Sequence, residues 1–322
     1  MPPLAQMSTL ERWTYAIKPK SWPKLLVPTF LGQALGAHAA GAVDPVSASV
    51  GVALTLGIGV FIVLLNDWSD EDVDRIKREM FPDGCSPKTI PDGILPSQHL
   101  LAAGLAAGFV ALMLGCWYEV ALQRAHATAA VAGALAIFWA YSLPPLRLNY
   151  RGGGEVLEML GVGGALPLLH AYVQGGVAWH EDYWVLAGYM LLALTSALAS
   201  GLSDEESDRA GHKTTFTTLF GNRFVVRAID AVLLASALSW LALSFLYSDD
   251  IALVGALVSA AFYIFERRAK VRALGLEAKT NAFPQIAAYK QALHRVLWRA
   301  GMMVGGTFAL LTAAEVWSLW LS

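Results

Sequence analysis

Aspartates recur at helical spacing in the segment that begins at Asn66. Asp67, Asp70 and Asp74 stand at positions i, i+3 and i+7, so a helix places them in one narrow stripe. Carboxylates on one face repel one another and raise each other's pKa, and the cost grows where a helix leaves a bilayer. A divalent cation removes this cost, and Mg²⁺ prefers carboxylate oxygens while keeping waters and bridging to substrate phosphates. We therefore predict that Asn66 and the three aspartates are Mg²⁺ ligands rather than a solvated helix end.

A second acidic cluster supports this interpretation. The stretch "GLSDEESDRAGHKTT" places Asp204 and Asp208 at i and i+4, and Lys213 follows them closely. Two aspartate faces across a helical bundle can hold Mg²⁺ between them and clamp a diphosphate, while lysine and arginine neutralise the remaining charge. We assign catalytic roles to Asp67 and Asp70 of the first cluster and to Asp204 and Asp208 of the second, and the latter two are also predicted Mg²⁺ ligands.

Other acids of the two clusters lie outside these stripes. At helical spacing Glu71 borders the first stripe, Asp72 points away from it, and Glu205 and Glu206 point away from the second. We therefore expect Asp72 to be dispensable.

Basic and aromatic residues near the clusters are candidates for substrate contacts. Four basic residues follow the first cluster and are candidate phosphate ligands, namely Arg75, Lys77, Arg78 and Lys88. The stretch "YSLPPLRLNYRGGGE" ends a helix at two prolines and then presents basic groups and a glycine turn, which is typical of a substrate loop but also of an ordinary basic connection. Lys18, in "KPKSW", either reaches the diphosphate or anchors the chain at the membrane interface. The predicted substrate contacts are Asn66, Lys18, Arg75, Lys88, Tyr141, Arg147, Tyr150, Arg151 and Lys213.

The surrounding sequence predicts that membrane helices position these clusters. Of the 322 residues, 56% are hydrophobic and 15% charged, whereas soluble domains have roughly 25% charged residues. Runs of about 20 apolar residues can cross a bilayer as helices, and several glycines and Pro167 interrupt the fifth run. We expect an all-α bundle of about nine transmembrane helices that forms a single domain over residues 1–322. The nine runs are approximately 22–43, 46–65, 99–122, 127–143, 155–178, 183–202, 224–247, 250–265 and 301–321.

The basic residues predict the orientation of the bundle. Lysine and arginine concentrate in alternate connections, and such connections stay in the cytoplasm. We therefore expect the N-terminal arm (1–21) and the active-site loops 66–98 and 203–223 on the cytoplasmic side, with the C-terminus outside. The basic and partly amphipathic segment 266–300 is interpreted as a cytoplasmic interfacial connection, either a loop or a helix on the lipid headgroups. No apolar leader opens the chain, so we expect no cleaved signal peptide.

These patterns predict a multi-pass integral protein, of the bacterial inner-membrane type, whose active site faces the cytoplasm. Its partners would be the lipid bilayer and small molecules, and we expect no nucleic acid. His170 lies alone in the fifth run, where a hydrogen-bonded core histidine is a better interpretation than a catalytic base.

The two clusters together resemble the UbiA superfamily of intramembrane prenyltransferases. Its first motif, N-D-x-x-D-x-x-x-D, matches Asn66 to Asp74, and its second, D-x-x-x-D, matches Asp204 and Asp208. The order of motifs and apolar runs fits over the whole chain. The resemblance implies a two-Mg²⁺ site that binds an isoprenyl diphosphate, loss of diphosphate to leave an allylic carbocation, and capture of that cation by an aromatic acceptor.

The acceptor is left open by the sequence. Residues 141–155 resemble the branch that prenylates 1,4-dihydroxy-2-naphthoate in menaquinone synthesis, but that branch usually carries glycine where this chain has Val73. The first motif is closer in form to the branches that act on 4-hydroxybenzoate, haem or chlorophyll precursors. We therefore expect a quinone-precursor type of acceptor without choosing between 1,4-dihydroxy-2-naphthoate and 4-hydroxybenzoate.

Two other functions share some of these features. Some members of the superfamily cyclise the prenyl diphosphate without an acceptor, and the motifs do not separate such a terpene cyclase from a transferase. An ion-coupled transporter would also place acids in glycine-broken helices. Here, however, the acids cluster at one rim of the predicted bundle rather than near its middle, which favours an enzyme.

Overall fold

All regular elements among the described residues of the computed structural model, 7–278 and 283–321, are helices. The short helix α4 (Glu71–Met80) carries acidic residues in its first turn and basic residues in its last turn. This distribution stabilises the helix because it complements the helix dipole. The α-helices are α1 (Thr9–Ile17), α2 (Pro23–Ala40), α3 (Pro45–Ser69), α4 (Glu71–Met80), α5 (Ser97–Ala121), α6 (Ala127–Ser142), α7 (Gly154–Glu158), α8 (Leu166–Gly175), α9 (Val185–Gly201), α10 (Glu205–Ala210), α11 (Phe216–Phe220), α12 (Asn222–Leu246), α13 (Ile251–Glu277) and α14 (Phe283–Leu321).

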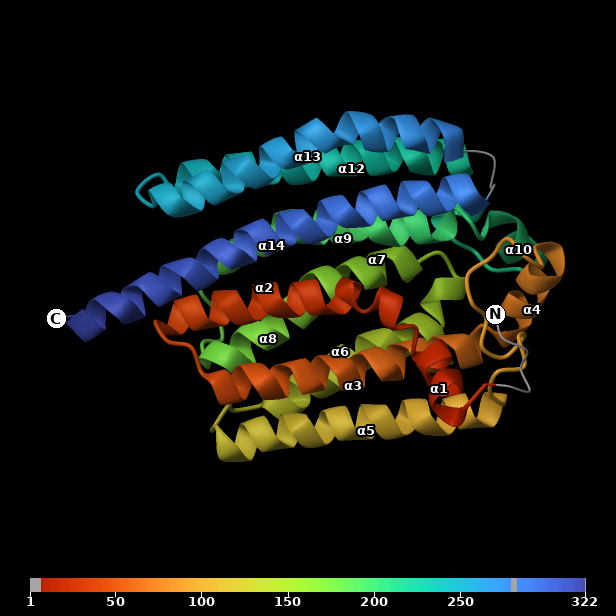
Figure 1. The fold of residues 1–322 in the computed structure, drawn as a ribbon, viewed down its shortest axis with the longest axis horizontal. Helices are drawn as coiled ribbons and strands as arrows, with labels where there is room; N and C mark the ends of the chain where they lie inside the picture. Colours follow the sequence, from red (N-terminus) through yellow and green to blue (C-terminus); the bar gives the residue numbers. More distant parts are fainter. Residues whose placement is uncertain (1–6, 279–282, 322) are drawn as a thin grey trace.

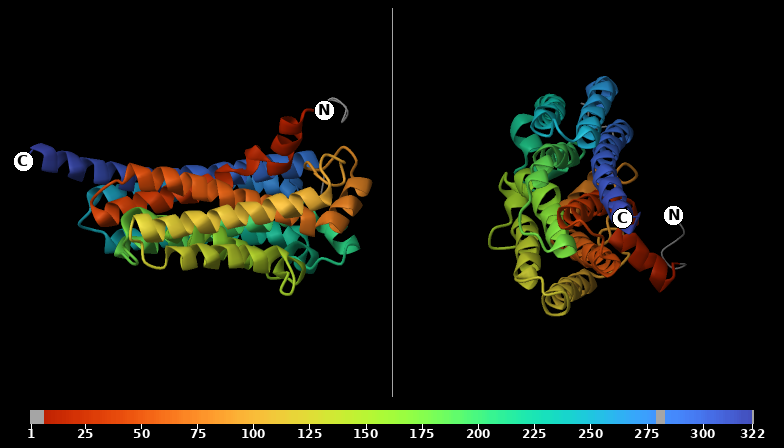
Figure 2. Two further views of the ribbon diagram at one scale, coloured as in Figure 1. Left: turned by 90° about the horizontal axis from the view of Figure 1, so that it is seen from below. Right: turned by 90° about the vertical axis from the view of Figure 1, so that its left-hand side faces the viewer.

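The long helices run side by side along the longest axis of the molecule, and the short helices α1, α4 and α10 gather at one end (Figures 1 and 2). Helix α2 packs against α8, α14 and α3, whereas α12 and α13 form a hairpin at one edge of the bundle. The acidic clusters therefore lie at the end of the bundle where the short helices are.

Within the described residues, six helical segments are long and apolar enough to cross a membrane. The protein is thus an integral, multi-pass membrane protein, while the number of nine spans stays a prediction. The six are Pro45–Ser69, Ser97–Ala121, Gly154–Gly175, Glu181–Gly201, Asn222–Leu246 and Pro284–Ser318, and the shorter apolar helix α6 lies beside them.

The predicted interruption of the fifth apolar run is confirmed. Helices α7 and α8 are separated by a π-helical segment, Met159–Ala165. At Gly163 a Cβ atom would lie 2.7 Å from the Cα atom of Met190 in α9, so only glycine allows this close approach. Wide helical turns of this kind occur frequently at functional sites.

The predicted extent of the connection 266–300 is wrong. Helix α13 continues to Glu277 and α14 begins at Phe283, so most of this segment belongs to two long helices of the bundle. The residues between these helices lie outside the described residues. The predicted active-site segments 66–98 and 203–223 contain the helices α4, α10 and α11. Acidic first turns and basic last turns favour α4 and α10, and a capping box at Thr215 favours α11.

His170 is a core residue, as predicted. It is completely buried, and its Nε2 atom lies 2.8 Å from the hydroxyl of Thr55 on α3. This contact joins α8 to α3 by a hydrogen bond where no water is available.

Candidate active site

The first aspartate cluster lies where α3 passes into α4. Asp70 separates the two helices, yet its amide donates to the carbonyl of Asn66 and its carbonyl accepts from Asp74, both at 2.8 Å. Helical hydrogen bonding thus continues through the junction, and Asp67, Asp70 and Asp74 stay on one face. All three side chains line the same cavity, as their spacing predicted.

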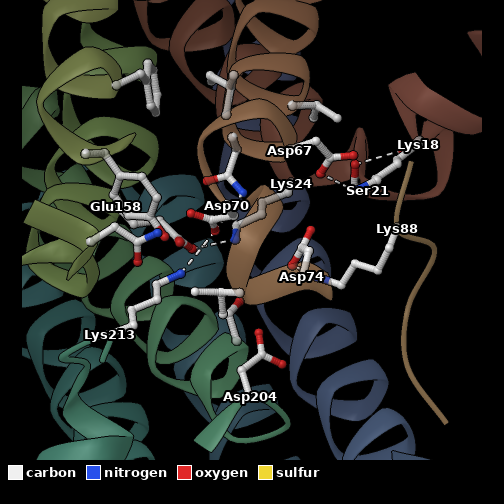
Figure 3. Close-up of a pocket in the computed structure, with 18 of the residues that line it drawn as sticks. Lys18, Ser21, Lys24, Asp67, Asp70, Asp74, Lys88, Glu158, Asp204 and Lys213 are labelled. Atoms are coloured by element: carbon white, nitrogen blue, oxygen red, sulfur yellow. Dashed lines mark hydrogen bonds and ion pairs between the residues drawn. The ribbon is translucent and has the colours of Figure 1, made fainter. Parts of the chain in front are cut away.

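The cavity has a volume of about 310 Å³, and residues of α4 and α10 line it. Figure 3 shows its side chains, and Figure 1 shows these two short helices together at one end of the bundle. It brings together residues that are more than 190 positions apart in the chain, from the N-terminal arm to the second cluster. Its lining residues that carry a polar side chain are Lys18, Ser21, Lys24, Asn66, Asp67, Asp70, Asp74, Lys77, Lys88, Tyr141, Asn149, Glu158, Ser200, Asp204, Asp208 and Lys213.

A lysine contacts each aspartate of the first cluster. Nζ of Lys18 lies 2.5 Å from Asp67, and Nζ of Lys213 lies 3.1 Å from Asp70 (Figure 3). Lys88 forms an ion pair with Asp74. These lysines come from three separate parts of the chain, so the fold itself neutralises the stacked carboxylates.

The second cluster follows α9 and faces the first across the cavity. Asp204 stands at the N-terminal end of α10, and Asp208 lies within that helix with only 3% of its surface exposed. Lys77 of α4 forms an ion pair with Asp204. A lysine of the first cluster therefore contacts the second, while Lys213 beside the second cluster contacts the first.

Burial and neighbouring charges shift the pKa values of several of these groups in opposite directions. Although burial disfavours its ionised form, Asp70 has a pKa below its ordinary value because the ammonium group of Lys213 faces it. Lys213 in turn has a raised pKa, since Asp70 and Asp208 outweigh its own burial. Burial raises the pKa of Asp208 to about 6 and also raises that of Asp74.

Beyond the charged groups the cavity becomes apolar. Ile62 and Val63 lie one helical turn before Asn66 on α3, and Phe138 and Val162 line the same space from α6 and the π-helical segment. The site therefore has a charged end at the rim of the bundle and an apolar end directed into it.

The model of the UbiA prenyltransferase family matches residues 25–290, which is most of the chain and includes both aspartate clusters. The chain belongs to the UbiA prenyltransferase family.

Solved structures of family members share this fold. A UbiA homologue from Archaeoglobus fulgidus, bound to DMAPP and Mg²⁺, superposes with a TM-score of 0.67 at 17% identity and covers 91% of this chain and 99% of its own. A UbiA homologue from Aeropyrum pernix K1 gives a TM-score of 0.60 at 16% identity over 84% of this chain and 96% of its own. A structure of digeranylgeranylglyceryl phosphate synthase gives 0.59 at 13% identity, over 94% of this chain and 98% of its own. A comparison with the curated proteins found no sequence match.

Several predicted substrate contacts of this UbiA-family chain do not line the cavity. The guanidinium group of Arg75 is exposed and pairs with Glu71 at 2.7 Å. Arg147 donates to the carbonyl of Ser69 at 2.5 Å and lies over the ring of Tyr150. Arg147 therefore supports the end of α3 from outside the cavity, whereas Arg75 pairs along the exposed face of α4.

Tyr150 and Arg151 lie one layer behind the lining residues. The ring centroid of Tyr150 is 5.0 Å from Nζ of Lys213, and the Tyr150 carbonyl accepts a hydrogen bond from the amide of Thr214. Arg151 is exposed and joins Thr214 through a backbone bridge. This stretch positions Lys213 rather than reaching the cavity itself, whereas Tyr141 at its start does line it.

Two polar residues of the cavity were not predicted from the sequence. Lys24 at the start of α2 forms an ion pair with Glu158 at the end of α7, and both line the cavity. Glu158 lies in an otherwise apolar run, three residues after Glu155, and this isolated charge was the available signal.

Asp92 was also not predicted from the sequence, and it does not line the cavity. Its carboxylate accepts hydrogen bonds from the Tyr15 hydroxyl of α1 at 2.5 Å, from Arg78 of α4 at 2.8 Å and from the Lys88 amide at 2.9 Å. Although partial burial acts to raise it, the pKa of Asp92 lies below its ordinary value because the Tyr15 hydroxyl, the Lys88 amide and Arg78 donate to the carboxylate. Asp92 thus ties α1, α4 and the Lys88 loop together beside the cavity.

The donor set suits Mg²⁺. Six carboxylates, from the five aspartates of the two clusters and Glu158, line one cavity together with the Asn66 amide. Oδ1 of Asp70 is buried and accepts no hydrogen bond from the described residues. Among the described residues, no three His, Cys, Asp or Glu side chains are arranged to hold a metal ion by themselves. This arrangement fits a Mg²⁺ ion that takes one or two carboxylates and completes its shell with water and substrate phosphate oxygens.

Proposed function

We propose that this protein transfers an isoprenyl group from an allylic prenyl diphosphate to an aromatic acceptor within the membrane, and that the reaction depends on Mg²⁺. One observation carries the proposal. Two aspartate clusters, with the four lysines that pair with them, line the charged end of a cavity that becomes apolar toward the middle of the bundle. A prenyl diphosphate has the same division into a highly charged head and an apolar chain.

The aspartates and lysines would hold the diphosphate. Asn66, Asp67, Asp70 and Asp74 would hold Mg²⁺ from one side of the cavity and the second cluster from the other. When bound, Mg²⁺ supplies charge that stabilises the departing diphosphate. The ammonium groups that contact the carboxylates lie on the lining of the cavity, where each can also donate to a phosphate oxygen.

The apolar end would hold the prenyl chain. When the bond between the allylic carbon and the diphosphate oxygen breaks, both electrons leave with the diphosphate and a carbocation remains. The aromatic faces of Phe138 and Tyr141 line the cavity and can stabilise a cation. Ile62, Val63 and Val162 surround this region with apolar groups and exclude water, which would otherwise capture the cation.

The acceptor would be an electron-rich ring of the quinone-precursor type, such as 1,4-dihydroxy-2-naphthoate or 4-hydroxybenzoate. Its ring carbon would bond to the allylic carbon, and the ring would then lose a proton or, in the naphthoate case, a carboxyl group. The pattern of residues 141–155 supports this class of acceptor and a place in quinone or menaquinone biosynthesis. Binding of DMAPP and of GPP with Mg²⁺ by the Archaeoglobus fulgidus homologue supports the donor class.

A product assay by mass spectrometry tests this function. The purified protein would be incubated with Mg²⁺, a series of prenyl diphosphates, and dihydroxynaphthoate, hydroxybenzoate or no acceptor. We expect a prenylated ring product that requires both substrates. A hydrocarbon formed without acceptor would instead identify a terpene cyclase, and metal-dependent solute flux into liposomes without diphosphate release would identify a transporter.

We further propose that the cavity opens to the cytoplasm in a bacterial inner membrane, because basic residues gather at that end. Cys85, in the loop between α4 and α5, is partly exposed and provides a test. A membrane-impermeant maleimide should label Cys85 in inverted vesicles but not in intact spheroplasts. Labelling only from the outer side would contradict the orientation. The Cys85→Ser variant controls for labelling of Cys116.

A further inference from the structure

A second cavity lies on the outer surface of the hairpin formed by α12 and α13. Its volume is about 330 Å³, and it shares no residue with the candidate active site. Figure 1 shows this hairpin at the edge of the bundle, with the end of α13 near the same end of the molecule as α4 and α10. The lining residues are Asp230, Phe265, Arg268, Ala269, Arg272, Ala273 and Leu276.

The spacing of these residues on α13 places them on one face of the helix. Phe265, Ala269, Ala273 and Leu276 follow one another at intervals of three or four positions. The two alanines leave a hollow between the larger apolar side chains, and Leu276 is 58% exposed. The groove is therefore open to the surroundings of the bundle and largely apolar along its length.

Two arginines give this apolar groove a positive charge. Arg268 donates two hydrogen bonds, at 2.6 and 2.7 Å, to the carboxylate of Asp230 on α12, which fixes the orientation of its guanidinium group. Arg272 is exposed one turn later, and no described residue forms an ion pair or hydrogen bond with it. With one carboxylate and two guanidinium groups, the groove carries one net positive charge.

Arg272 lies near the end of α13, which Figure 1 shows at the same end of the bundle as α4 and α10. It lies five residues before the end of α13, or about 7 Å along the helix axis. Helix α12, its partner in the hairpin, is long and apolar enough to span the membrane. Arginine binds phosphate oxygens through two parallel donors, and a phosphodiester has the single negative charge that the groove lacks.

We propose that this groove binds one anionic phospholipid, with its headgroup phosphate at Arg272 and Arg268 and an acyl chain along Phe265, Ala269 and Ala273. The apolar wall favours a membrane lipid over a free phosphate, because a free phosphate would contact the arginines and leave the apolar side chains uncovered. This site is independent of the proposed prenyl transfer.

Native mass spectrometry of the full-length protein tests the proposal. The protein would be released from detergent with added phosphatidylglycerol or phosphatidylcholine, and the retained lipid would be counted. We expect retention of phosphatidylglycerol but not phosphatidylcholine, and we expect Arg272→Gln to weaken it by about tenfold. Lys270→Gln removes the same charge from an exposed position of α13 outside the groove and should leave retention unchanged.

Three results would overturn the proposal. Equal retention by Arg272→Gln and the unmodified protein would show that the groove is not the site. Equal retention of phosphatidylglycerol and phosphatidylcholine would show that the groove does not select an anionic lipid. Displacement of phosphatidylglycerol by millimolar inorganic phosphate would identify a site for soluble phosphate. Because Arg272 contacts no described residue by hydrogen bond or ion pair, the variant should fold, and an unchanged melting temperature would verify this.

Discussion

The two aspartate clusters differ in how their charges are neutralised. In the first, Asp67, Asp70 and Asp74 are each at most 6% exposed, and each contacts a lysine. In the second, the side chain of Asp204 is 31% exposed, and Asp208 is buried without an ion pair to any described residue. The first cluster is thus balanced by the fold, whereas the second retains more uncompensated charge.

The lysines connect these unequal halves. Lys77 belongs to α4, beside the first cluster, but contacts Asp204, and Lys213 follows α10 but contacts Asp70. Neither cluster is therefore complete without a cation from the other. The two motifs therefore form one electrostatic unit, even though more than 120 residues separate them in the sequence.

The largest effect is expected when either half loses a carboxylate. Asp67→Ala and Asp204→Ala should each lower kcat/KM by roughly 10³-fold, because each half would hold part of the charge that stabilises the departing diphosphate. Prenylated product measured by mass spectrometry gives the rates, and gel filtration with a melting curve controls for folding. Full activity of both variants would exclude the two-sided site.

A double variant tests whether the two clusters act together in binding the diphosphate. Asp70→Asn and Asp208→Asn should each weaken binding of a non-hydrolysable prenyl diphosphate analogue by about 10²-fold, and the double variant should be no more than a few-fold weaker than the worse single variant. Isothermal titration calorimetry with Mg²⁺ measures this. Effects that simply multiply would show that the clusters act independently.

Removal of the connecting lysines should have a smaller effect on activity. Lys77→Met and Lys213→Met should each reduce kcat/KM by about 10- to 100-fold, since a charge-assisted contact is lost. Lys213→Met also leaves Asp70 buried without an ionic partner, which should destabilise the protein by about 3 kcal/mol. The melting temperature measures the second effect. Lys20→Met, at an exposed position, is the control, and an equal loss there would contradict the specific role.

Asp92→Asn should produce a modest change that separates positioning from catalysis. We expect KM for the prenyl diphosphate to rise about tenfold with a smaller change in kcat, because α1 and the Lys88 loop would be held less firmly. Steady-state kinetics at saturating acceptor measures both constants. Asp72→Asn, an exposed acid of α4, should stay within about twofold of the unmodified protein. Equal KM and kcat values for the two variants would show that Asp92 does not position the diphosphate site.

The sequence was sufficient for the parts of the site that depend on local spacing. The stripe of Asp67, Asp70 and Asp74 follows from helical geometry, and the break near Gly163 follows from its glycines. The ends of α13 and α14 were not predictable, because basic residues at a membrane border are compatible with either a helix or a loop. The long-range contacts were also beyond sequence reasoning.

The long-range contacts show which parts of the site the spacing of residues in the sequence cannot predict. Nothing local to Asp92 indicates that Tyr15, Arg78 and Lys88 converge on it, and nothing local to Lys24 indicates Glu158. Conversely, Arg75 lies one residue after the first motif and still points away from the cavity. Proximity in sequence identified the correct segments, but only tertiary packing decided which of their side chains line the site.

Diphosphate release from a prenyl diphosphate, in the presence of the acceptor, tests the central claim most directly. It would be measured with and without Mg²⁺ for the unmodified protein and for Asp67→Ala and Asp204→Ala. We predict release only when Mg²⁺ and both clusters are present. Release that persists without divalent ions, or in both variants, would contradict the account of two aspartate clusters acting as one metal-dependent clamp.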